Sequence, residues 1–492
     1  MTLVLNTNIG ALQAQRAMAV SQSEMQKAME RLSTGLRINS AADDAAGLAM
    51  IERMNSQIRG LTMATKNAND GISLIRTTEN ALVEVSGMLQ RMRELAVQAA
   101  NATNSDSERS FANNEITQLQ KEISRVSANT RYNGSQTLNG SFTAKSLQVG
   151  IFSGENIAFS IASIEASLLG SYVITSPAQA ALAAHSNSYT GNSAIDGDDI
   201  TIAGNGNTRI VTAEVNDTAK SIATKINAVA GATNVMAQSR TSALLYSTSA
   251  TDQTSTVKIN NVATAAFTLS SATVTDAVSK INAIADTTGV MASATTDGKV
   301  ILIDADGDNI TVENTTSGRT ELRVQSLEND AVTANSTVIS LAAPGGNDMT
   351  TVSGSMRLTS LDGFIVTQDA TSAGGSFFTD GATVATLESV SSIAVTSVIG
   401  AGNALAILDG ALETISSMRG GLGTLQNRLD YAVSNLMKVT EYTTGARSRI
   451  ADADFAAETS RLAKAQVLQQ AGASMLAQAN ASTDIVMQVL RG

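Results

Sequence analysis

Apolar residues near the N-terminus recur at intervals of three, four and seven, which is typical of amphipathic helices. This spacing predicts a helix from about Asn8 to Leu32 and, after a break at 33–43, a second and very long helix that runs to about Ala102. A polar turn then precedes a third predicted helix at 107–128. A helix much longer than about 25 residues favours coiled-coil-like packing, because its apolar face must be covered along the whole length.

Helical spacing returns close to the C-terminus. It predicts a helix from about Ala404 to Tyr442 and another that resumes after 447–450 and continues to the end of the chain. Amphipathic helices at opposite ends must bury their apolar faces against a partner. We therefore predict that they pack against each other as an antiparallel bundle, with the middle of the chain looping out between them.

The middle of the chain follows a different pattern. Alternation at 147–151 and 157–161 predicts a β-hairpin, and the sequence after Gly170 is rich in Thr, Ser, Gly and Asp with short β-branched runs. The fold class predicted for the whole chain is therefore multidomain α+β: a long antiparallel helical bundle or coiled coil made from both termini, with a β-rich central insert.

The insert contains an internal repeat. Lys225-Ile-Asn-Ala recurs as Lys280-Ile-Asn-Ala, and Val235-Met-Ala recurs as Val290-Met-Ala, both displaced by 55 residues. Two matching segments at one displacement indicate a duplication. Each copy is predicted to form a small α+β module with a short helix, at Thr218–Val229 and Thr275–Ala285.

Composition narrows the possible chemistry. The 492 residues are 43% apolar but only 3% aromatic, which favours closely packed slender helices over one thick core. The absence of cysteine excludes disulfides and Cys-ligated metals, and the single histidine, His185, excludes multi-His sites. We interpret His185 as a solvated loop residue and predict no catalytic residue, metal site or cofactor.

The net charge of −11 is concentrated in the middle of the chain, where residues 151–400 hold 23 Asp and Glu against 10 Lys and Arg. This distribution disfavours binding to nucleic acid or to anionic membranes, and suits a hydrated insert between nearly neutral ends. The N-terminus has no pattern typical of a cleaved secretion signal, and no apolar run approaches the ~18 residues of a membrane span.

Two acidic motifs have competing interpretations. Asp43-Asp44 could be a catalytic pair, but adjacent helical residues point in different directions, so helix capping is favoured. Asp304-Ala-Asp-Gly-Asp308 resembles part of a calcium loop, but the EF-hand spacing would require glycine at Asn309, so a hairpin turn is favoured. The basic pairs Arg91/Arg93 and Arg447/Arg449 lack interleaved aromatic residues and are interpreted as ion-pair partners.

Several long motifs resemble those of bacterial flagellin, the filament subunit. The N-terminal motifs are Glu30–Gly47, Lys66–Ser73 and Leu89–Gln98, and the C-terminal ones are Gln426–Leu429, Ala446–Ile450, Ala465–Gly472 and Leu476–Asn480. They occur in order and together span about the first 170 and the last 100 residues. The middle is covered only by its likeness to a repeat found in flagellin inserts.

The resemblance implies a layered filament. Residues 1–43 and 448–492 would line the inner core, 44–170 and 395–447 would form the outer core with the hairpin, and 171–394 would project from the surface. It also implies type III export to the extracellular filament without a cleaved signal. The implied partners are further copies of the chain, a flagellar export chaperone on the C-terminal helical region, the filament cap and the hook-associated junction proteins.

The resemblance further implies recognition of the monomer by host Toll-like receptor 5, with Arg91, Leu95, Gln98 and Glu115 as candidate receptor contacts. The candidate assembly contacts are apolar residues of the terminal helices: Leu5, Ile9, Leu12, Leu468, Ala471, Met475, Leu476, Ile485, Val489 and Leu490. A hook–filament junction protein is the alternative function. An enzyme carried on the insert, such as a zinc peptidase, is disfavoured because one histidine cannot supply a His-Glu-x-x-His site.

Overall fold

The computed structural model describes residues 7–101, 103–186, 199–214, 217–295, 297–318, 322–368 and 377–491, with the side chains of 482–491 left outside the description. Contacts divide the chain into two compact units. The first comprises Met1–Arg76, Ala144–Phe159 and Gly423–Gly492, and the second comprises Thr77–Thr143 and Ser160–Leu422. The three-layer division 1–43/448–492, 44–170/395–447 and 171–394 stays a prediction.

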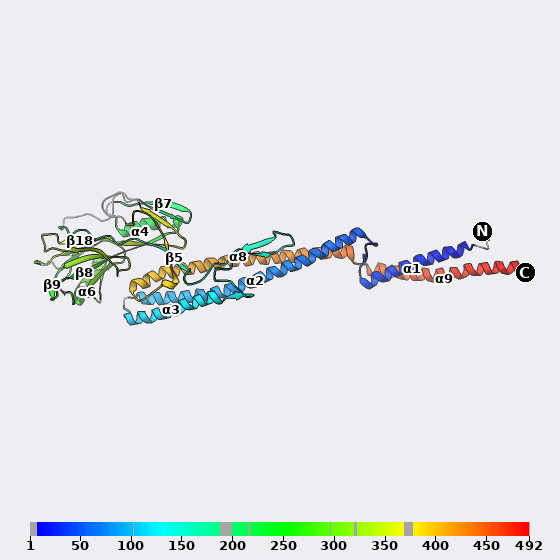
Figure 1. Cartoon of the computed structure of the whole chain (residues 1–492), viewed down its shortest axis with the longest axis horizontal. Coiled ribbons are helices and arrows are strands. Elements are labelled where there is room, and N and C mark those ends of the chain that lie inside the picture. The colour runs from blue at the N-terminus through cyan, green and yellow to red at the C-terminus, as the bar shows by residue number, and fades with distance from the viewer. Residues whose placement is uncertain are drawn as a thin grey trace. The chain divides into compact units, whose positions relative to one another are not determined.

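The long helices predicted at both ends are confirmed (Figure 1). Their bounds are α1 (Ile9–Thr34), α2 (Ala45–Ala100), α3 (Asp106–Asn129), α8 (Val398–Ala451) and α9 (Phe455–Arg491). The predicted pause between Tyr442 and the Arg447 region is wrong, because α8 continues through Gly445 to Ala451. One glycine costs about 1 kcal/mol in a helix interior, which a helix packed along its length can absorb.

Side-chain caps define where these helices begin. The Asn8 carboxamide accepts the Ala11 N–H at the start of α1, and Asp44 accepts the Gly47 N–H at 2.9 Å at the start of α2. Ser105 and Glu108 form a reciprocal capping box on α3. Asp43 accepts hydrogen bonds from the backbone and side chain of Ser40, which lower the pKa of its carboxyl group. The capping interpretation is thus confirmed for Asp44, whereas Asp43 holds the turn that precedes the helix.

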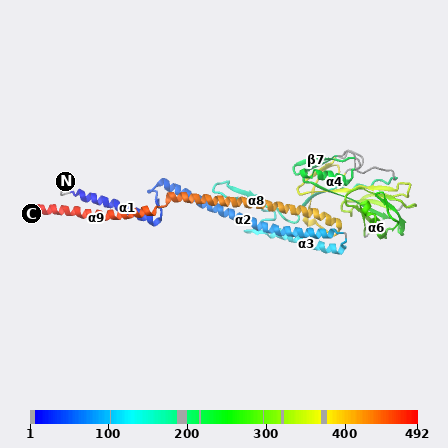
Figure 2. The ribbon, with the colours of Figure 1, turned by 180° about the vertical axis from the view of Figure 1, so that it is seen from behind.

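In the first unit, α1 and α9 run side by side in opposite directions (Figures 1 and 2). The predicted hairpin is also present, as the antiparallel pair β3 (Lys145–Gln148) and β4 (Asn156–Phe159). It lies on α2, where two glycines remove side-chain bulk: a Cβ on Gly71 would lie 2.4 Å from Leu147, and one on Gly60 would lie 2.7 Å from Ile151. The hairpin is therefore seated by close approach to the helix.

In the second unit, the helical part has a core of fully buried aliphatic side chains on α2, among them Leu82, Val85 and Leu89. Two side chains of α3 bind the segment that returns from the insert. Gln120 donates to the carbonyls of Val390 and Ile393, in and just after the 3₁₀ turn η1 (Val390–Ser392), and Asn113 accepts the Val395 N–H. A short ladder joins β1 (Arg131–Tyr132) to β2 (Ser135–Gln136).

The described part of the insert is built from antiparallel ladders and short helices. The largest sheet has the order β13-β14-β8-β19-β5-β22, with β16 pairing β8 and β17 pairing β16. Its strands are β5 (Gly170–Thr175), β8 (Met236–Ser247), β13 (Val290–Ala294), β14 (Val300–Asp304), β16 (Leu322–Leu327), β17 (Ala334–Ser340), β19 (Ser355–Ser360) and β22 (Thr386–Ser389).

Smaller ladders flank this sheet, in the orders β21-β20-β6-β7, β11-β10-β15-β18 and β12-β9. Their strands are β6 (Asp199–Gly204), β7 (Asn207–Thr212), β9 (Gln253–Ser255), β10 (Val257–Ile259), β11 (Val262–Ala263), β12 (Phe267–Leu269), β15 (Ile310–Asn314), β18 (Met349–Val352), β20 (Ile365–Gln368) and β21 (Gly381–Val384). The short helices are α4 (Ala219–Ala228), α5 (Ala230–Thr233), α6 (Thr275–Asn282) and α7 (Ala285–Thr288).

The predicted repeat is confirmed in atomic detail. Asn227 on α4 donates to the Ala237 carbonyl at 2.9 Å and accepts its N–H at 2.8 Å, and Asn282 on α6 makes the same pair with Ala292 at 2.9 and 2.6 Å. Each copy has its own hydrophobic core. The long strand β8 joins them, because its first half pairs with β19 and its second half with β14 and β16.

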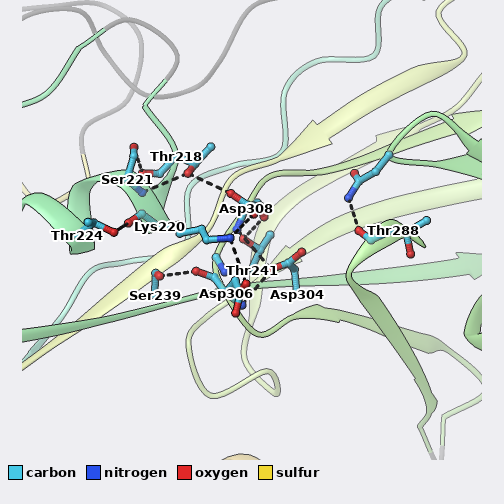
Figure 3. Close-up of polar contacts among 12 residues, drawn as sticks. Thr218, Lys220, Ser221, Thr224, Ser239, Thr241, Thr288, Asp304, Asp306 and Asp308 are labelled. Carbon is cyan, nitrogen blue, oxygen red and sulfur yellow. Dashed lines mark hydrogen bonds and ion pairs between the residues drawn. The ribbon is translucent and has the colours of Figure 1, made fainter. Parts of the chain in front are cut away.

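The Asp304–Asp308 segment is a connection between sheets, so the hairpin prediction is wrong: β14 pairs with β13 and β8, whereas β15 pairs with β10 and β18. The buried Asp304 carboxylate accepts the N–H groups of Asp306 and Gly307, each at 3.0 Å. Lys220 Nζ lies 3.1 Å from Asp306 Oδ2 and 2.8 Å from Asp308 Oδ2 (Figure 3). The lysine ammonium thus pairs with both outer carboxylates.

His185 is not a solvated loop residue. Its backbone forms an antiparallel bridge with Met349, and its half-buried ring has Nδ1 at 2.9 Å from the Met349 carbonyl oxygen. Burial lowers the pKa of the imidazole. The error arose because a two-residue bridge leaves no periodic signal in a segment rich in Ala and Ser.

Helix α8 contains a stretch that is long and apolar enough to cross a membrane by length and composition. One such helix is weak support for a span, because the core helix of a soluble protein passes the same test.

The insert enters and leaves at adjacent positions: the Val390 N–H donates to the Leu169 carbonyl at 2.7 Å, and Gly170 pairs with Ser389. We predict that replacing residues 171–388 by a short Gly/Ser linker leaves the helices folded, because the ends to be joined are already in contact. Circular dichroism and thermal melting of the shortened chain check this. Loss of cooperative helical melting would contradict it and show that the insert holds the helices together.

Candidate assembly and recognition surfaces

The contact line between α1 and α9, here called the α1–α9 seam, mixes small side chains with Leu and Met. Its α1 residues alternate at intervals of three and four, as do those of α9. They are Ala11, Ala14, Met18, Ser21, Met25, Ala28 and Leu32 on α1, and Glu458, Leu462, Ala465, Gln469, Gly472, Leu476 and Ala479 on α9. Ala and Gly at this seam let the two backbones approach closely.

Polar contacts fix the register of the seam at both ends. Asn8 Nδ2 donates to the Ala479 carbonyl at 2.9 Å, and Arg31 NH1 lies 3.4 Å from Glu458 Oε1. Glu458 is 5% exposed and also accepts from Arg461 at 3.2 Å. A buried carboxylate is costly unless it is paired, so the pair that Glu458 forms with Arg31 across the seam favours one register over its neighbours, whereas Arg461 lies on the same helix as Glu458.

A second set of large apolar side chains of these helices lies outside the seam. Ile9, Leu12 and Val20 are 54–57% exposed on α1. On α9, Val467 is 67%, Leu468 44% and Met475 65% exposed, and Ala471 is exposed beside them. We call these residues the outer apolar stripes. The prediction that the stripes bury themselves on each other is therefore wrong for Ile9, Leu12, Leu468, Ala471 and Met475, because other residues of the same helices form the seam.

The other predicted assembly residues fall elsewhere. Leu476 belongs to the seam and is half-buried. Leu5 lies outside the described residues, and so do the side chains of Ile485, Val489 and Leu490, whose backbone continues α9.

A backbone joint links the breaks in the N- and C-terminal helical segments. Leu36 forms an antiparallel bridge with Asp452, Arg37 N–H donates to the Ala451 carbonyl at 2.6 Å, and Ala453 N–H donates to Gly35 at 3.0 Å. Ile38 packs on Ile51 and Ala451 beneath it. Backbone hydrogen bonds between the two segments thus hold both helix breaks in place.

The predicted receptor contacts lie where α2 meets α3. Arg91 Nε is 2.8 Å from Glu115 Oε1 and its NH1 is 3.0 Å from Glu94 Oε2, and these hydrogen bonds raise the pKa of Arg91. Arg91, Gln98 and Glu115 are exposed. Arg93 pairs with Asp409 at 2.6 Å, so the ion-pair interpretation of Arg91 and Arg93 is confirmed.

Leu95 does not share this surface, because it is only 3% exposed. At 100° per residue it is rotated about 40° from Arg91, toward the buried Met92 and Ala96. The predicted role of Leu95 as a direct contact is not compatible with that burial.

Sequence reasoning missed a set of exposed aromatic side chains. Tyr431, Tyr442 and Phe455 in the first unit are 68–79% exposed, and Phe111 in the second is 71% exposed. Because aromatic residues make up only 3% of the chain, large rings left in solvent suggest surfaces that a partner covers. For Tyr431 the available signal was its position off the apolar spacing of α8, whereas Phe111 follows the spacing of its helix and gave no such signal.

The described residues contain no group of three or more His, Cys, Asp or Glu side chains that could hold a metal ion. The outer apolar stripes and the exposed aromatic side chains are instead surfaces suited to association with other chains.

Comparison with known proteins identifies the family of the chain. The family model "Bacterial flagellin N-terminal helical region" matches residues 5–143, and "Bacterial flagellin C-terminal helical region" matches residues 405–490. B-type flagellin of Pseudomonas aeruginosa is 36% identical over 498 aligned residues, with 100% of both chains covered. The chain belongs to the bacterial flagellin family.

Flagellin B of Vibrio cholerae is 33% identical, again with 100% of both chains covered. A solved structure of flagellar hook-associated protein-3 from Legionella pneumophila covers 81% of this flagellin and 98% of its own chain, at 16% identity and a TM-score of 0.32. That likeness is too loose to carry an argument for a junction protein. This flagellin is a structural subunit that polymerises into the helical flagellar filament used for swimming.

The buried small residue Ala465 of the α1–α9 seam leads to a prediction about this flagellin. Ala465→Leu should separate α1 from α9, because Ala465 is 1% exposed and overpacking costs about 1–3 kcal/mol. Limited proteolysis of the terminal helices should become faster. Ala463→Leu, at an exposed position on the same helix, is the matched control and should leave the rate unchanged. Equal rates for the two variants would show that the seam does not depend on small residues.

Proposed function

We propose that this flagellin assembles by covering its outer apolar stripes with neighbouring subunits. The observation that carries the proposal is that α1 and α9 each have two apolar faces: one forms the seam within the chain, whereas the other, which includes Leu468 and Met475, remains exposed. Burying a Leu or Met side chain contributes about 1.5–3 kcal/mol, so several such residues per subunit supply a large driving force. Each stripe is then free to serve contacts between chains.

The proposed location of these contacts is the inner core of the filament, formed by residues 1–43 and 448–492. The support is that the helices break close to both limits, at 35–44 and at 452–454. Residues 44–170 and 395–447 would form the outer core, and 171–394 the outer surface. The excess of acidic residues in the insert suits a position in water.

The proposed route to the filament is type III export to the cell exterior without a cleaved signal. The flagellar export chaperone, the filament cap and the hook-associated junction proteins are proposed partners, on the basis of the family resemblance. The exposed apolar stripe of α9 supports the chaperone proposal, because such a stripe needs cover before assembly. We also propose that the subunit catalyses no reaction, since its sequence has one histidine and no cysteine.

Leu468→Ser combined with Met475→Ser should impair polymerisation while leaving the monomer folded, because both side chains are already exposed in the monomer. Losing two buried apolar contacts should raise the minimum concentration for filament growth at least about tenfold. Sedimentation of seeded filaments measures it.

Gln466→Ser combined with Gln470→Ser, at exposed polar positions on the same helix, is the control. Filaments formed by the Leu468/Met475 variant at the wild-type concentration would refute assembly through this stripe.

A second proposed role is recognition of the monomer by Toll-like receptor 5 through Arg91, Gln98 and Glu115. The family resemblance supports it, together with the exposure of these three residues.

Arg91→Ala combined with Glu115→Ala should weaken receptor activation by roughly tenfold, since charge-assisted hydrogen bonds contribute about 1.5–3 kcal/mol each. A reporter-cell titration with purified monomer measures this. Arg125→Ala is the control, because Arg125 forms a comparable exposed pair with Glu122 on α3. Equal loss in the control, or none in the double variant, would contradict the proposed contact surface.

A further inference from the structure

Two arginines lie side by side on one face of the largest sheet of the insert. Arg240 is on β8 and Arg357 on β19, and the register pairs Arg357 with Gln238, two residues before Arg240. Residues two apart on a strand share a face, so Gln238, Arg240 and Arg357 project to the same side. The opposite face of these strands carries Ala237, Met356 and Leu358 of a hydrophobic core.

The two guanidinium groups have only one carboxylate between them. Arg357 is 5% exposed and forms a bidentate pair with Glu388. Arg240 is half-buried and donates to the Asn329 carbonyl at 3.3 Å, with no carboxylate partner among the described residues. Burial and the charge of Arg357 lower the pKa of Arg240.

This arrangement is unlike that of the nearby lysines. Lys220, Lys225 and Lys258 each have a carboxylate within 3.1 Å. In a strongly acidic insert, a half-buried arginine beside a second arginine is a local excess of positive charge. Such an excess is stabilised when an anion binds beside it.

A cavity of about 370 Å³ opens beside these residues. Its walls include Gln238, Arg240, Arg357 and, from the first turns of α8, Asn403. The side-chain amides of Gln238 and Asn403 make no hydrogen bond within the described ranges. At its other end, Lys220 is already engaged by Asp306 and Asp308 (Figure 3).

A neighbouring cavity of about 390 Å³ shares Arg357 and Asn403, but Glu328, Asp330 and Glu388 also line it. These carboxylates disfavour an anion there, so the candidate site is the first cavity. Its volume suits a ligand no larger than a small metabolite.

We propose that this cavity binds an oxyanion, a carboxylate, phosphate or sulfate group of a small ligand, through the Arg240 guanidinium with the Gln238 and Asn403 amides as further donors. Guanidinium groups bind such groups through paired N–H donors, and the amides would bind further oxygens of the ligand. Arg357, which is paired with Glu388, adds positive charge at the wall of the cavity. The site lies in the insert and does not depend on the assembly or receptor proposals.

Titration calorimetry and thermal melting of the full-length chain test the proposal, with sodium phosphate, sodium sulfate and sodium glucuronate compared with sodium chloride at equal ionic strength. We expect saturable binding and a higher melting temperature with at least one oxyanion. Binding of phosphate or sulfate alone would assign the site to free oxyanions, and tighter binding of glucuronate would assign it to a sugar acid. No saturable binding beyond the chloride control would overturn the proposal.

Arg240→Gln should weaken binding at least about tenfold, the loss expected for a charge-assisted contact. It should not lower the melting temperature without ligand, because it removes a like charge beside Arg357. Arg209→Gln, an exposed arginine of the same insert, is the matched control and should bind normally. Asn403→Ala gives a second, milder test on α8. Unchanged affinity in Arg240→Gln, or equal loss in Arg209→Gln, would refute the site.

Discussion

The packing of one face of α1 against one face of α9 is the interaction on which the terminal helices depend. Each of the two helices has apolar residues on more than one side, and a pair of helices can bury only one side of each. The residues that do not face the partner helix remain exposed for contacts with other chains. Ala465 and Gly472 take the inner positions, whereas Val467 and Met475 stay exposed. The exposed side chains are therefore not buried when the monomer folds, and their burial stabilises the association between subunits instead.

The joint at the helix breaks also depends on pairing between the two ends of the chain. Neither 35–44 nor 452–454 could form a stable ladder alone, because each is short and polar. Together they satisfy one another's backbone groups through the Leu36–Asp452 bridge, and Ile38 covers the contact with apolar surface. The breaks are therefore defined positions, each capped by an aspartate, at Asp44 and Asp454, that starts the next helix.

The insert shows how duplication builds a larger fold without a larger core. Each copy keeps its own core and its own Asn-to-backbone clamp, and the two share the single strand β8. Strand β8 leaves β19 for β14 directly after Arg240. At this point the face of the sheet opposite the hydrophobic core carries polar side chains, among them Gln238 and Arg357. A surface of this kind is free to acquire charge that neither core could tolerate.

Local pattern determined the element types in this protein: the 3.6-residue spacing predicted the helices at both ends, and the 55-residue displacement predicted the repeat with Asn227 and Asn282 in equivalent places. These features depend on neighbours in the chain, so the sequence carries them directly. Tertiary structure alone decided which side of each helix faces a partner, because Leu95 and Arg91 differ by about 40° of rotation, which spacing cannot resolve. It also decided the bridge at His185, the ion pair of Lys220 with Asp306 and Asp308, and the meeting of Arg240 with Arg357. Those contacts join segments about 90 to 160 residues apart, and nothing in either segment alone specifies its partner.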